Sequence, residues 1–564
     1  MKILSGVGAS KGIAIGRLLF YTGSPYKIEK ITVSDTQAEI ARFEEARAVA
    51  VANLNNIYEK AKIELGDNDS MIFQIHAMML EDPDYVESIT EQIKTEQVNA
   101  EYAVGQTAEK FAAIFSEMED AYMKARAADV FDVSKSLVRE LSGEKAQNLD
   151  SVKGQVILAT HDLMPSETVQ LDKTKVLAFV TGGGSKISHS AILARTMSIP
   201  AVVGLGDAFD ELDDEGIVVV DGFTGNVYLK PDDATIASFT RKREDYLAER
   251  EKLAELKGKP SKTKDGVEIE INANIGHPGD VSLVLDNDAE GIGLFRSEFL
   301  YMESDDFPTE DVQFEVYKEI LERMNGKRVI VRTLDLGADK HVPYFDIPNE
   351  ENPAMGYRAI RICLKRPDIF TVQLRALLRA SVYGRLAIMI PMITSLDEVL
   401  KTKEIIETIK LDLYAKGIPF ADDYEFGIMI ETPAAVMISD ILAQHVQFFS
   451  IGTNDLTQYS LAVDRMNESI SNLYDPSHLA ILRMMQLTVE NGRRCGIWTG
   501  VCGESASDPS LIQVFLSMGV AELSVSPSAV LDVREKVRET DLSECREDIL
   551  SYLHNGGWEK LKLP

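Results

Sequence analysis

The spacing of apolar side chains changes character several times along the 564 residues of this chain. Short alternating runs typical of β-strands fill the first twenty residues. Residues 34–66 then place apolar side chains at steps of three and four, which predicts an amphipathic helix, and Ser34 with Gln37 fits a capping box at its start. Further helices are expected over residues 72–80, 84–94, 100–117 and 122–141. Residues 30–145 are therefore predicted to form an all-helical bundle.

The hydrophobic pattern changes after Gly143, where short apolar runs alternate with small and polar residues. The runs VILAT, KVLAFVTG, PAVVG, GIVVVDG and NVYLK predict strands interleaved with short helices. The N-terminal strands have nowhere else to pair, so we expect them to join this sheet. The pattern therefore predicts a compact α/β domain built from residues 1–29 and 146–230, with the helical bundle as an insertion.

The remaining chain predicts a connector followed by a barrel. Residues 231–264 are strongly charged with sparse leucines, which indicates a solvated helix that ends near Gly258 and Pro260 and acts as a semi-rigid linker. Residues 265–564 contain eight strand-like runs: EIEINANI, GIGLFR, RVIVRTLD, LAIMIPMI, FGIMIE, FFSIGTND, IWTGVCGE and AELSVSP. Helical stretches separate them, among them residues 310–324, 396–416, 433–445 and 478–495. Eight alternating units of this length are typical of a (β/α)8 barrel, so the predicted fold class is multidomain α/β.

Composition narrows the function classes. The chain carries 90 acidic and 59 basic side chains, a formal charge of -31, which argues against a nucleic-acid or anionic-membrane surface and favours a partner with a basic face. No basic start precedes an apolar run of signal-peptide type, and no window approaches eighteen unbroken apolar residues. The four cysteines, Cys363, Cys495, Cys502 and Cys545, lie far apart without metal-type spacing. We therefore expect a cytoplasmic protein with reduced thiols.

One glycine-rich stretch, residues 181–195, presents a histidine at the head of a predicted helix. Its sequence TGGGSKISHSAILAR lets a loop approach a ligand closely, and Ser188 is placed to cap the helix that carries His189. Loop amides at a helix N-terminus form an anion site, which suits phosphate beside His189. The same pattern also fits an ordinary turn with a surface histidine, and this stretch alone does not decide between the two.

The ends of the predicted barrel strands carry polar residues of a particular kind. They are Arg296, Arg332, Glu431, Asn454 with Asp455, and Cys502 with Glu504, and Arg465 follows ten residues after Asp455. Active sites of such barrels lie at the carboxyl ends of the strands. Arginines clamp phosphate and carboxylate groups in fork geometry, and paired carboxylates suit Mg²⁺. The set therefore predicts a site for a phosphorylated acid, although any one of these arginines could form a surface ion pair.

These residues lie in runs that resemble a known family. FFSIGTNDLTQYSLAVDR, GLFRSEFLYM, VIVRTLDLGADK, NPAMGYRAIRI, GIMIETPAA and IWTGVCGE closely resemble the phosphoenolpyruvate-utilising enzymes. The runs IFQIHAMMLEDPDY and MKARAADVFDVSKSLV in the helical region narrow the resemblance to Enzyme I of the sugar phosphotransferase system. The resemblance covers nearly the whole chain.

The resemblance implies a phosphoryl relay. Phosphoenolpyruvate and Mg²⁺ bind in the barrel, His189 attacks the phosphorus, and the phosphohistidine passes its group to the carrier protein HPr in the first step of sugar uptake. Matching positions imply that phosphoenolpyruvate is bound by Arg296, Arg332, Asn454, Asp455 and Arg465, with Arg358 and Lys340 near the phosphate, and that Glu431 and Asp455 bind the metal. Cys502 corresponds to the acid that protonates the enolate carbon, whereas its neutral interpretation is a small core residue.

The resemblance also implies roles for whole regions. Residues 30–145 would receive HPr, residues 231–264 would let the histidine domain swing between the two half-reactions, and residues 265–564 would bind phosphoenolpyruvate and form a homodimer. His76 in the bundle is expected to be an exposed or half-buried histidine of an amphipathic helix.

Several positions depart from the family pattern. Ser185, Lys186 and Ile187 stand in the segment that usually reads GGRTSH before the histidine. Lys11 replaces the usual proline of ASPGIA, and Ala338 replaces the usual glycine of LDIGGDK. None of these changes removes a group with a direct role in the relay, but they leave rate and carrier preference open.

Three alternatives remain at this point. An ATP-using relative such as phosphoenolpyruvate synthase or pyruvate phosphate dikinase needs a nucleotide-binding domain, and no GxxxxGK[ST] motif precedes the histidine. A regulatory relay that feeds an HPr-like protein uses the same half-reactions, so motifs do not separate it from sugar uptake. A catalytically silent sensor of phosphoenolpyruvate would fit the altered histidine loop.

Overall fold

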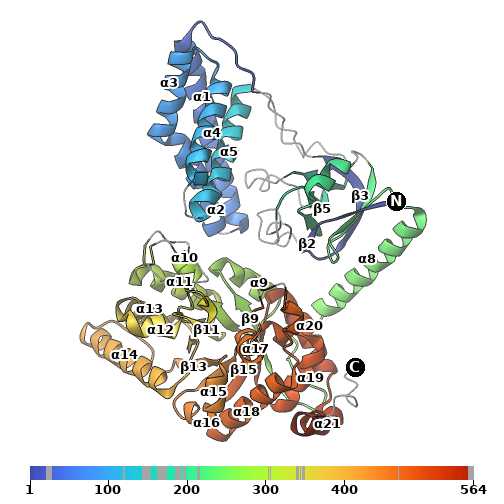
Figure 1. Cartoon of the computed structure of the whole chain (residues 1–564), viewed down its shortest axis with the longest axis vertical. Coiled ribbons are helices and arrows are strands. Elements are labelled where there is room, and N and C mark those ends of the chain that lie inside the picture. The colour runs from blue at the N-terminus through green and yellow to red at the C-terminus, as the bar shows by residue number, and fades with distance from the viewer. Residues whose placement is uncertain are drawn as a thin grey trace. The chain divides into compact units, whose positions relative to one another are not determined.

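The computed structural model divides the chain into two compact units, Met1–Glu251 and Lys252–Pro564. It describes the chain apart from residues 21–27, 66, 118–120, 143–153, 162–174, 185–190, 192–193, 195–198, 213–215, 303, 305, 338–341, 343, 346–349, 466, 468 and 557–564, and apart from the side chains of residues 59–65, 67–72, 115–117, 121–128 and 471. Figure 1 shows the elements of both units.

The first unit contains an eight-stranded mixed sheet in the order β1-β8-β7-β3-β4-β5-β6-β2. Its strands are β1 (Lys2–Ser5), β2 (Val7–Ser10), β3 (Ile13–Phe20), β4 (Val156–Thr160), β5 (Val176–Thr181), β6 (Ala201–Val203), β7 (Ile217–Asp221) and β8 (Asn226–Leu229). Strand β3 runs parallel to β4 and antiparallel to β7, while β1 pairs with β8 and β2 with β6. The prediction that the N-terminal strands join the later sheet is confirmed.

The helices between β3 and β4 are α1 (Thr36–Leu65), α2 (Asp67–Glu81), α3 (Pro83–Glu96), α4 (Ala100–Glu117) and α5 (Ala121–Ser142). Phe43, Leu54, Phe73 and Ile89 are among the residues of their common core. The expected bundle of helices is present, as the labelled helices of Figure 1 show.

Two details of this bundle differ from the sequence predictions. Helix α1 begins at Thr36, and Asp35 Oδ1 accepts hydrogen bonds from the amides of Gln37 at 3.1 Å and Ala38 at 3.0 Å, so Asp35 caps the helix and the predicted capping box of Ser34 is wrong. The reason is that the helix starts one residue later, which places the Asp35 carboxylate over the free amides. His76 is fully buried. His76 belongs to α2 and faces α5. Its Nε2 lies 3.4 Å from Asp129 Oδ1, and its Nδ1 lies 3.7 Å from Asp132 Oδ2.

Helix α8 (Asp233–Ala254) follows the sheet and ends before the predicted stop near Gly258 and Pro260. The amides of Glu255, Leu256 and Lys257 bond to carbonyls three residues back, which tightens the chain into turns, and Gly258 has a φ of 74°. Two hydrogen bonds hold the residues that follow α8. Gly258 N donates to Asp288 Oδ2 at 2.7 Å, and Arg538 Nη1 donates to the Pro260 carbonyl at 2.6 Å.

The second unit is a closed barrel of eight parallel strands, as the eight predicted runs require. The strands are β9 (Glu270–Ile275), β10 (Ile292–Arg296), β11 (Val329–Arg332), β12 (Leu386–Ile390), β13 (Glu425–Ile430), β14 (Phe448–Ile451), β15 (Trp498–Val501) and β16 (Glu522–Val525), and β16 closes onto β9. Short apolar runs make these strands because a parallel strand that is buried on both faces needs apolar side chains at nearly every position.

Helices surround the barrel. They are α9 (Val281–Asp286), α10 (Phe299–Met302), α11 (Glu310–Arg323), α12 (Ile360–Lys365), α13 (Pro367–Ala380), α14 (Leu396–Ala415), α15 (Pro433–Met437), α16 (Ser439–Leu442), α17 (Thr453–Leu461), α18 (Leu479–Cys495), α19 (Pro509–Met518), α20 (Val530–Glu539) and α21 (Leu542–Asn555). The helix predicted over residues 433–445 is split at Ile438, whose φ of −113° and ψ of 18° leave the helical region. No helix in the described part of the chain is long and apolar enough to cross a bilayer.

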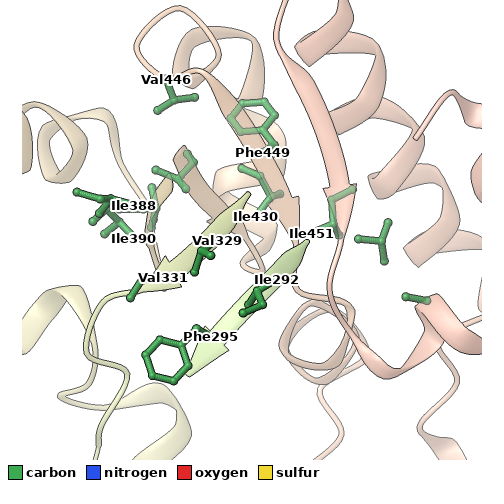
Figure 2. Close-up of a cluster of buried hydrophobic side chains, with 14 of the residues drawn as sticks. Ile292, Phe295, Val329, Val331, Ile388, Ile390, Ile430, Val446, Phe449 and Ile451 are labelled. Carbon is green, nitrogen blue, oxygen red and sulfur yellow. The ribbon is translucent and has the colours of Figure 1, made fainter. Parts of the chain in front are cut away.

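Alternate residues of the barrel strands belong to different apolar clusters. Figure 2 shows the larger one, to which Ile292, Val329, Ile388 and Ile430 contribute and which includes residues of the surrounding helices. The intervening positions form a second, smaller cluster of buried residues: Leu294, Ile330, Ala387, Met389, Met429, Phe448 and Cys502. Since successive side chains of a strand point to opposite faces, this second set lines the inside of the barrel.

Candidate active site at the carboxyl ends of the barrel strands

The inner row of side chains leads directly to the predicted site. Arg332 stands two positions after Ile330, and Glu431 stands two positions after Met429, so both follow inward-facing residues. The two side chains are buried. The period of two that packs the barrel interior therefore also aims these charged groups at its mouth.

Arg332 lies at the centre of a buried ion-pair network. Its Nη2 is 2.8 Å from Glu298 Oε1 and its Nη1 is 2.9 Å from Asp335 Oδ2. The second oxygen of Asp335 accepts a hydrogen bond from Arg358 Nη2 at 3.0 Å, and Arg358 Nη1 reaches Tyr459 Oη at 3.4 Å. Two arginines are thus held side by side by one shared carboxylate, in a geometry that suits the oxygens of a phosphate group.

The carboxylates keep both guanidinium groups charged. Burial by itself lowers the pKa of Arg332, but Glu298 and Asp335 outweigh it and raise that pKa above its ordinary value. The same balance holds for Arg358, where burial opposes and Asp335 and Asp455 raise the pKa. The cost of burying two cations is therefore offset before any ligand binds.

Glu431 is a buried carboxylate of this site with an incomplete set of hydrogen bonds. Its Oε1 accepts a 2.6 Å hydrogen bond from the amide of Met392, while its buried Oε2 has no hydrogen-bond partner among the described residues. Burial, followed by the nearby charges of Asp455 and Asp335, raises the pKa of Glu431 to about 8, although Arg332 acts in the opposite direction. An unpaired buried oxygen beside a second carboxylate is an arrangement that a divalent cation relieves.

Asn454 and Asp455 lie in the first turn of helix α17, directly after strand β14. Asn454 Oδ1 accepts a hydrogen bond from Glu504 N at 3.1 Å, which ties the ends of β14 and β15 together. Tyr474 Oη donates to the Asn454 carbonyl at 3.2 Å. The two polar side chains are half-buried, and they stand at a helix N-terminus, where backbone amides favour negative ligands.

Arg296 and Arg465 add positive charge at the same mouth. Both side chains are exposed. Surrounding barrel atoms nevertheless desolvate the Arg296 guanidinium, and this effect, together with repulsion from Arg332 and more weakly Arg465, lowers its pKa. Arg296 has Glu298 and Cys502 as opposing neighbours. The structure therefore brings together four of the predicted arginines.

Cys502 is a buried thiol at the inner edge of this mouth, with 4% of its surface exposed. Its Sγ donates to the Ile451 carbonyl at 3.6 Å. Burial, with a contribution from Glu431, raises the pKa of Cys502 to about 12, while the Ser450 hydroxyl and Arg332 lower it. The thiol therefore keeps its proton near neutral pH. The other cysteines are also free, with Cys495 exposed and Cys363 buried.

Some predicted residues lie outside the described part of the chain. They are His189, Lys340 and the family departures Ser185, Lys186, Ile187 and Ala338. The glycines before them are described: Gly182 N donates to the Thr160 carbonyl at 3.1 Å, Gly183 N to the His161 carbonyl at 2.8 Å, and Gly184 has a φ of 97°. Lys11 is exposed in the turn between β2 and β3.

Sequence reasoning did not single out Glu298 and Asp335, although they hold the arginines in place. Their signal was present in the motifs, since Glu298 lies two residues after Arg296 and Asp335 lies three residues after Arg332. A further described histidine, His161, lies at the end of β4 beside the glycine loop, with its Nε2 3.8 Å from Asp210. It was not considered from the sequence.

Comparison with known proteins gives the class of enzyme to which this geometry belongs. Three family descriptions match: the PEP-binding domain of PEP-utilising enzymes over residues 250–542, their N-terminal domain over residues 5–126 and their mobile domain over residues 152–225. The first covers more than half of the chain, so the chain belongs to the PEP-utilising enzymes, and a mouth of buried arginines beside acidic groups suits their phosphorylated substrate.

Full-length relatives narrow this class to one activity. Proteins called phosphoenolpyruvate-protein phosphotransferase are 44% identical in Staphylococcus carnosus, over 97% of this chain and 95% of the relative, and 44% identical in Bacillus subtilis, over 98% and 97%. A solution structure of Enzyme I (nEIt) is 38% identical over 43% of this chain and 99% of that one, with a TM-score of 0.38. The activity is therefore that of a phosphoenolpyruvate–protein phosphotransferase, which performs the first step of the phosphotransferase system.

Proposed function

We propose that the barrel mouth binds phosphoenolpyruvate and presents its phosphoryl group to His189, which then donates it to a histidine of an HPr-type carrier. The observation that carries this proposal is the buried pair Arg332 and Arg358, which share Asp335 and remain charged at the mouth of the barrel. Phosphoryl transfer depends mainly on position and on neutralised charge, which such a pair supplies.

The binding roles follow from the chemistry of each side chain. Arg332 and Arg358 neutralise the phosphoryl oxygens, and Arg296 and Arg465 are exposed cations suited to the substrate carboxylate and outer phosphate oxygens. Asn454 offers an amide at the same edge. Lys340 is assigned near the phosphate by its place in the family motif.

The residues present fit a Mg²⁺ ion. Glu431 Oε2 has no hydrogen-bond partner among the described residues, and Asp455 lies close enough to raise the pKa of Glu431, so these two carboxylates would hold the ion. No group of three or more metal-ligating side chains occurs in the described part of the chain, which agrees with an ion that takes its remaining ligands from water and substrate. When bound, Mg²⁺ supplies charge neutralisation for the phosphoryl and enolate oxygens.

Cys502 is proposed as the acid that completes the reaction. Transfer of the phosphoryl group to His189 leaves the enolate of pyruvate, whose C3 must gain a proton. The Cys502 thiol keeps its proton because of burial, and an enolate carbon is basic enough to take it. The S–H bond breaks, a C3–H bond forms, and pyruvate and a thiolate result.

The imidazole of His189 is assigned as the nucleophile by its place in the family motif. An imidazole with its ordinary pKa has an unprotonated nitrogen at neutral pH. His189 belongs to residues 146–230, which with residues 1–29 form the proposed phosphohistidine domain, and residues 231–264 form the proposed linker.

Partners and location complete the proposal. Residues 30–145 would receive the HPr-type carrier, whose basic face suits the net acidic charge of this chain. Residues 265–564 would form a homodimer, and exposed apolar side chains on the barrel support this, among them Leu411, Tyr414 and Met437. The protein is proposed to act in the cytoplasm.

Labelled phosphoenolpyruvate tests the relay. The protein is incubated with phosphoenolpyruvate carrying labelled phosphate and Mg²⁺, and wild type is compared with His189→Ala. We expect acid-labile, base-stable label on the wild type only, with release of pyruvate, and loss of the label when an HPr-type carrier is added. An unlabelled wild type, or equal label on His189→Ala, would overturn the proposal.

A further inference from the structure

A second buried carboxyl group lies inside the barrel, beneath Cys502. Glu522 is the first residue of β16 and is 2% exposed. Its Oε2 has no hydrogen-bond partner in the described part of the chain. The roles proposed above leave it unused, and a buried carboxyl group with an oxygen that lacks a hydrogen bond is costly in its charged form.

Ser524 and Glu522 face the same small space. A Cβ on Gly293 would stand 2.1 Å from Glu522 Oε1 and 2.2 Å from Ser524 Oγ, so both oxygens occupy the room that this glycine leaves. A Cβ on Gly500 would meet Glu522 Oε2 at 3.0 Å. The two glycines therefore let the carboxyl and the hydroxyl approach each other within the barrel.

Ser524 in turn stands next to Cys502. Gly500 pairs with Glu522 and Val501 with Leu523, so the next step of the parallel register places Cys502 beside Ser524 on neighbouring strands, which lie about 4.8 Å apart. Asn274 holds the pair together, because its Nδ2 donates to the carbonyls of Cys502 at 3.2 Å and Ser524 at 2.9 Å, and its Oδ1 accepts a hydrogen bond from the Ser524 hydroxyl at 2.5 Å.

We propose that Glu522 and Ser524 return a proton to Cys502 after each turnover. The proposal rests on the role of Cys502 as the acid. Once its S–H bond has broken, the Ser524 hydroxyl turns from Asn274 Oδ1 to the thiolate and gives it the proton, and Ser524 Oγ takes the proton of Glu522. The Glu522 carboxylate is then protonated again from water at the amino ends of the strands. No electrons are exchanged, and each cycle consumes one solvent proton.

The charges around Glu522 agree with a group that holds a proton. Burial raises the pKa of Glu522 to about 8, and Glu270 and Glu425 act in the same direction. The amide of Asn272 and the guanidinium of Arg328 lower it without cancelling the effect of burial. Near neutral pH a large share of the Glu522 side chains is therefore protonated and able to donate.

Isotope exchange separates this role from a structural one. Carbon-14 pyruvate is incubated with phosphoenolpyruvate, Mg²⁺ and the full-length protein in D2O. Exchange of carbon between pyruvate and phosphoenolpyruvate needs Cys502 to give and retake a proton, but it needs no proton from Ser524 or Glu522. Entry of deuterium at C3 does need the thiol to exchange with solvent between turnovers. The measured quantity is deuterium incorporated per carbon exchanged.

Glu522→Gln and Ser524→Ala should lower this ratio about tenfold or more while carbon exchange stays within about twofold of wild type. The control is Thr499→Val. Thr499 on β15 is similarly buried, and its Oγ1 has no hydrogen-bond partner among the residues that the structure describes, but this oxygen faces Gly492 of α18 outside the barrel. Thr499→Val should leave both quantities unchanged.

Two results would overturn the proposed return of a proton from Glu522 and Ser524 to Cys502. One is an unchanged ratio in Glu522→Gln, and the other is an equal fall of carbon exchange and deuterium entry, which indicates a structural role. Failure of the underlying chemistry is recognisable separately. If wild type exchanges no carbon, the phosphoryl half-reaction itself is wrong, and if Cys502→Ala keeps normal deuterium entry, Cys502 is not the acid. Either outcome also removes the relay.

Discussion

The two ends of the barrel are built from similar groups and use them differently. At the amino ends of the strands, Arg328 Nη1 lies 2.8 Å from Glu270 Oε2, its Nε lies 3.2 Å from Glu425 Oε1, and its guanidinium lies over the ring of Trp498 at 4.5 Å from the centroid. That ring stacks on Phe448 with centroids 4.6 Å apart. The cation at this end is enclosed by partners that belong to the fold.

At the carboxyl ends of the strands, the buried arginines have acidic partners, but other charged groups remain without a full set of partners. Arg332 and Arg358 have acidic partners, yet one oxygen of Glu431 has no partner in the described part of the barrel, and Arg296 is exposed with a lowered pKa. The buried arginine indicates a binding site where the unsatisfied carboxylate of its cluster lies at the mouth beside exposed cations, as Glu431 does. Glu522, the unsatisfied carboxyl group near Arg328, lies inside the barrel instead. This difference separates the structural end of the barrel from the catalytic end.

Removing the arginine at each end of the barrel should produce two different defects. Arg332→Met should lower the rate of protein phosphorylation by phosphoenolpyruvate by about 10²–10³ or more, because a charge that neutralises the phosphoryl group is lost. Arg328→Met should instead destabilise the barrel by about 3 kcal/mol, since it removes the cation beside the half-buried Glu270 and Glu425 and the buried Glu522. Rapid-quench phosphorylation and thermal unfolding of both variants measure the two effects.

Equal loss of phosphorylation per folded molecule in the two variants would contradict the division between the ends. Phosphorylation should be normalised to the folded fraction, because Arg328→Met is expected to lower the yield of folded protein.

A smaller effect is expected at the stacked indole. Trp498 Nε1 donates to Glu425 Oε2 at 2.9 Å, and Trp498→Phe removes this hydrogen bond while keeping an aromatic ring. We expect the free energy of unfolding to fall by about 1–3 kcal/mol, with the phosphorylation rate unchanged. A phosphorylation defect without a stability defect would show that this end also takes part in catalysis.

The last effect is a pH dependence of stability at Glu522, which is small for each pH unit. Its pKa is raised from 4.5 to about 8 in the folded protein, so the folded state binds the proton more tightly than the unfolded state. The stability contributed by Glu522 is present below about pH 4.5 and is lost as the pH rises toward about 8. Between pH 5 and 8, wild type should therefore lose stability relative to Glu522→Gln by at most about 1.4 kcal/mol per pH unit.

Urea unfolding of the two proteins at several pH values measures this difference. A difference that stays constant between pH 5 and 8 would show that Glu522 is ionised throughout the range.

Much of this molecule was predictable because its strands carry continuous apolar runs. All eight barrel strands were predicted, and the topology alone indicated that Arg332, Glu431 and Asp455 meet at one end. The partners Glu298 and Asp335 were missed because their contacts depend on side-chain packing after the barrel closes. Similarly, AELSVSP was recognised as a strand, but only the register with Gly500 and Gly293 shows what Glu522 faces.

The local errors have a similar origin. Asp35, not Ser34, caps α1, because one residue of difference in the start of a helix decides which side chain reaches the free amides. His76 was expected at the surface or half-buried, and it is buried because Asp129 and Asp132 of α5 supply polar neighbours within the bundle. Neither feature leaves a periodic signal in the sequence.

The most direct test of the central claim compares one carboxylate from each end of the barrel. Glu431→Gln and Glu425→Gln remove one charge each, and both proteins are phosphorylated with labelled phosphoenolpyruvate over a range of Mg²⁺ concentrations. We expect that Glu431→Gln loses the label or needs far more Mg²⁺, whereas Glu425→Gln is labelled as wild type once corrected for its folded fraction. Equal labelling and equal Mg²⁺ dependence of the two variants would contradict it.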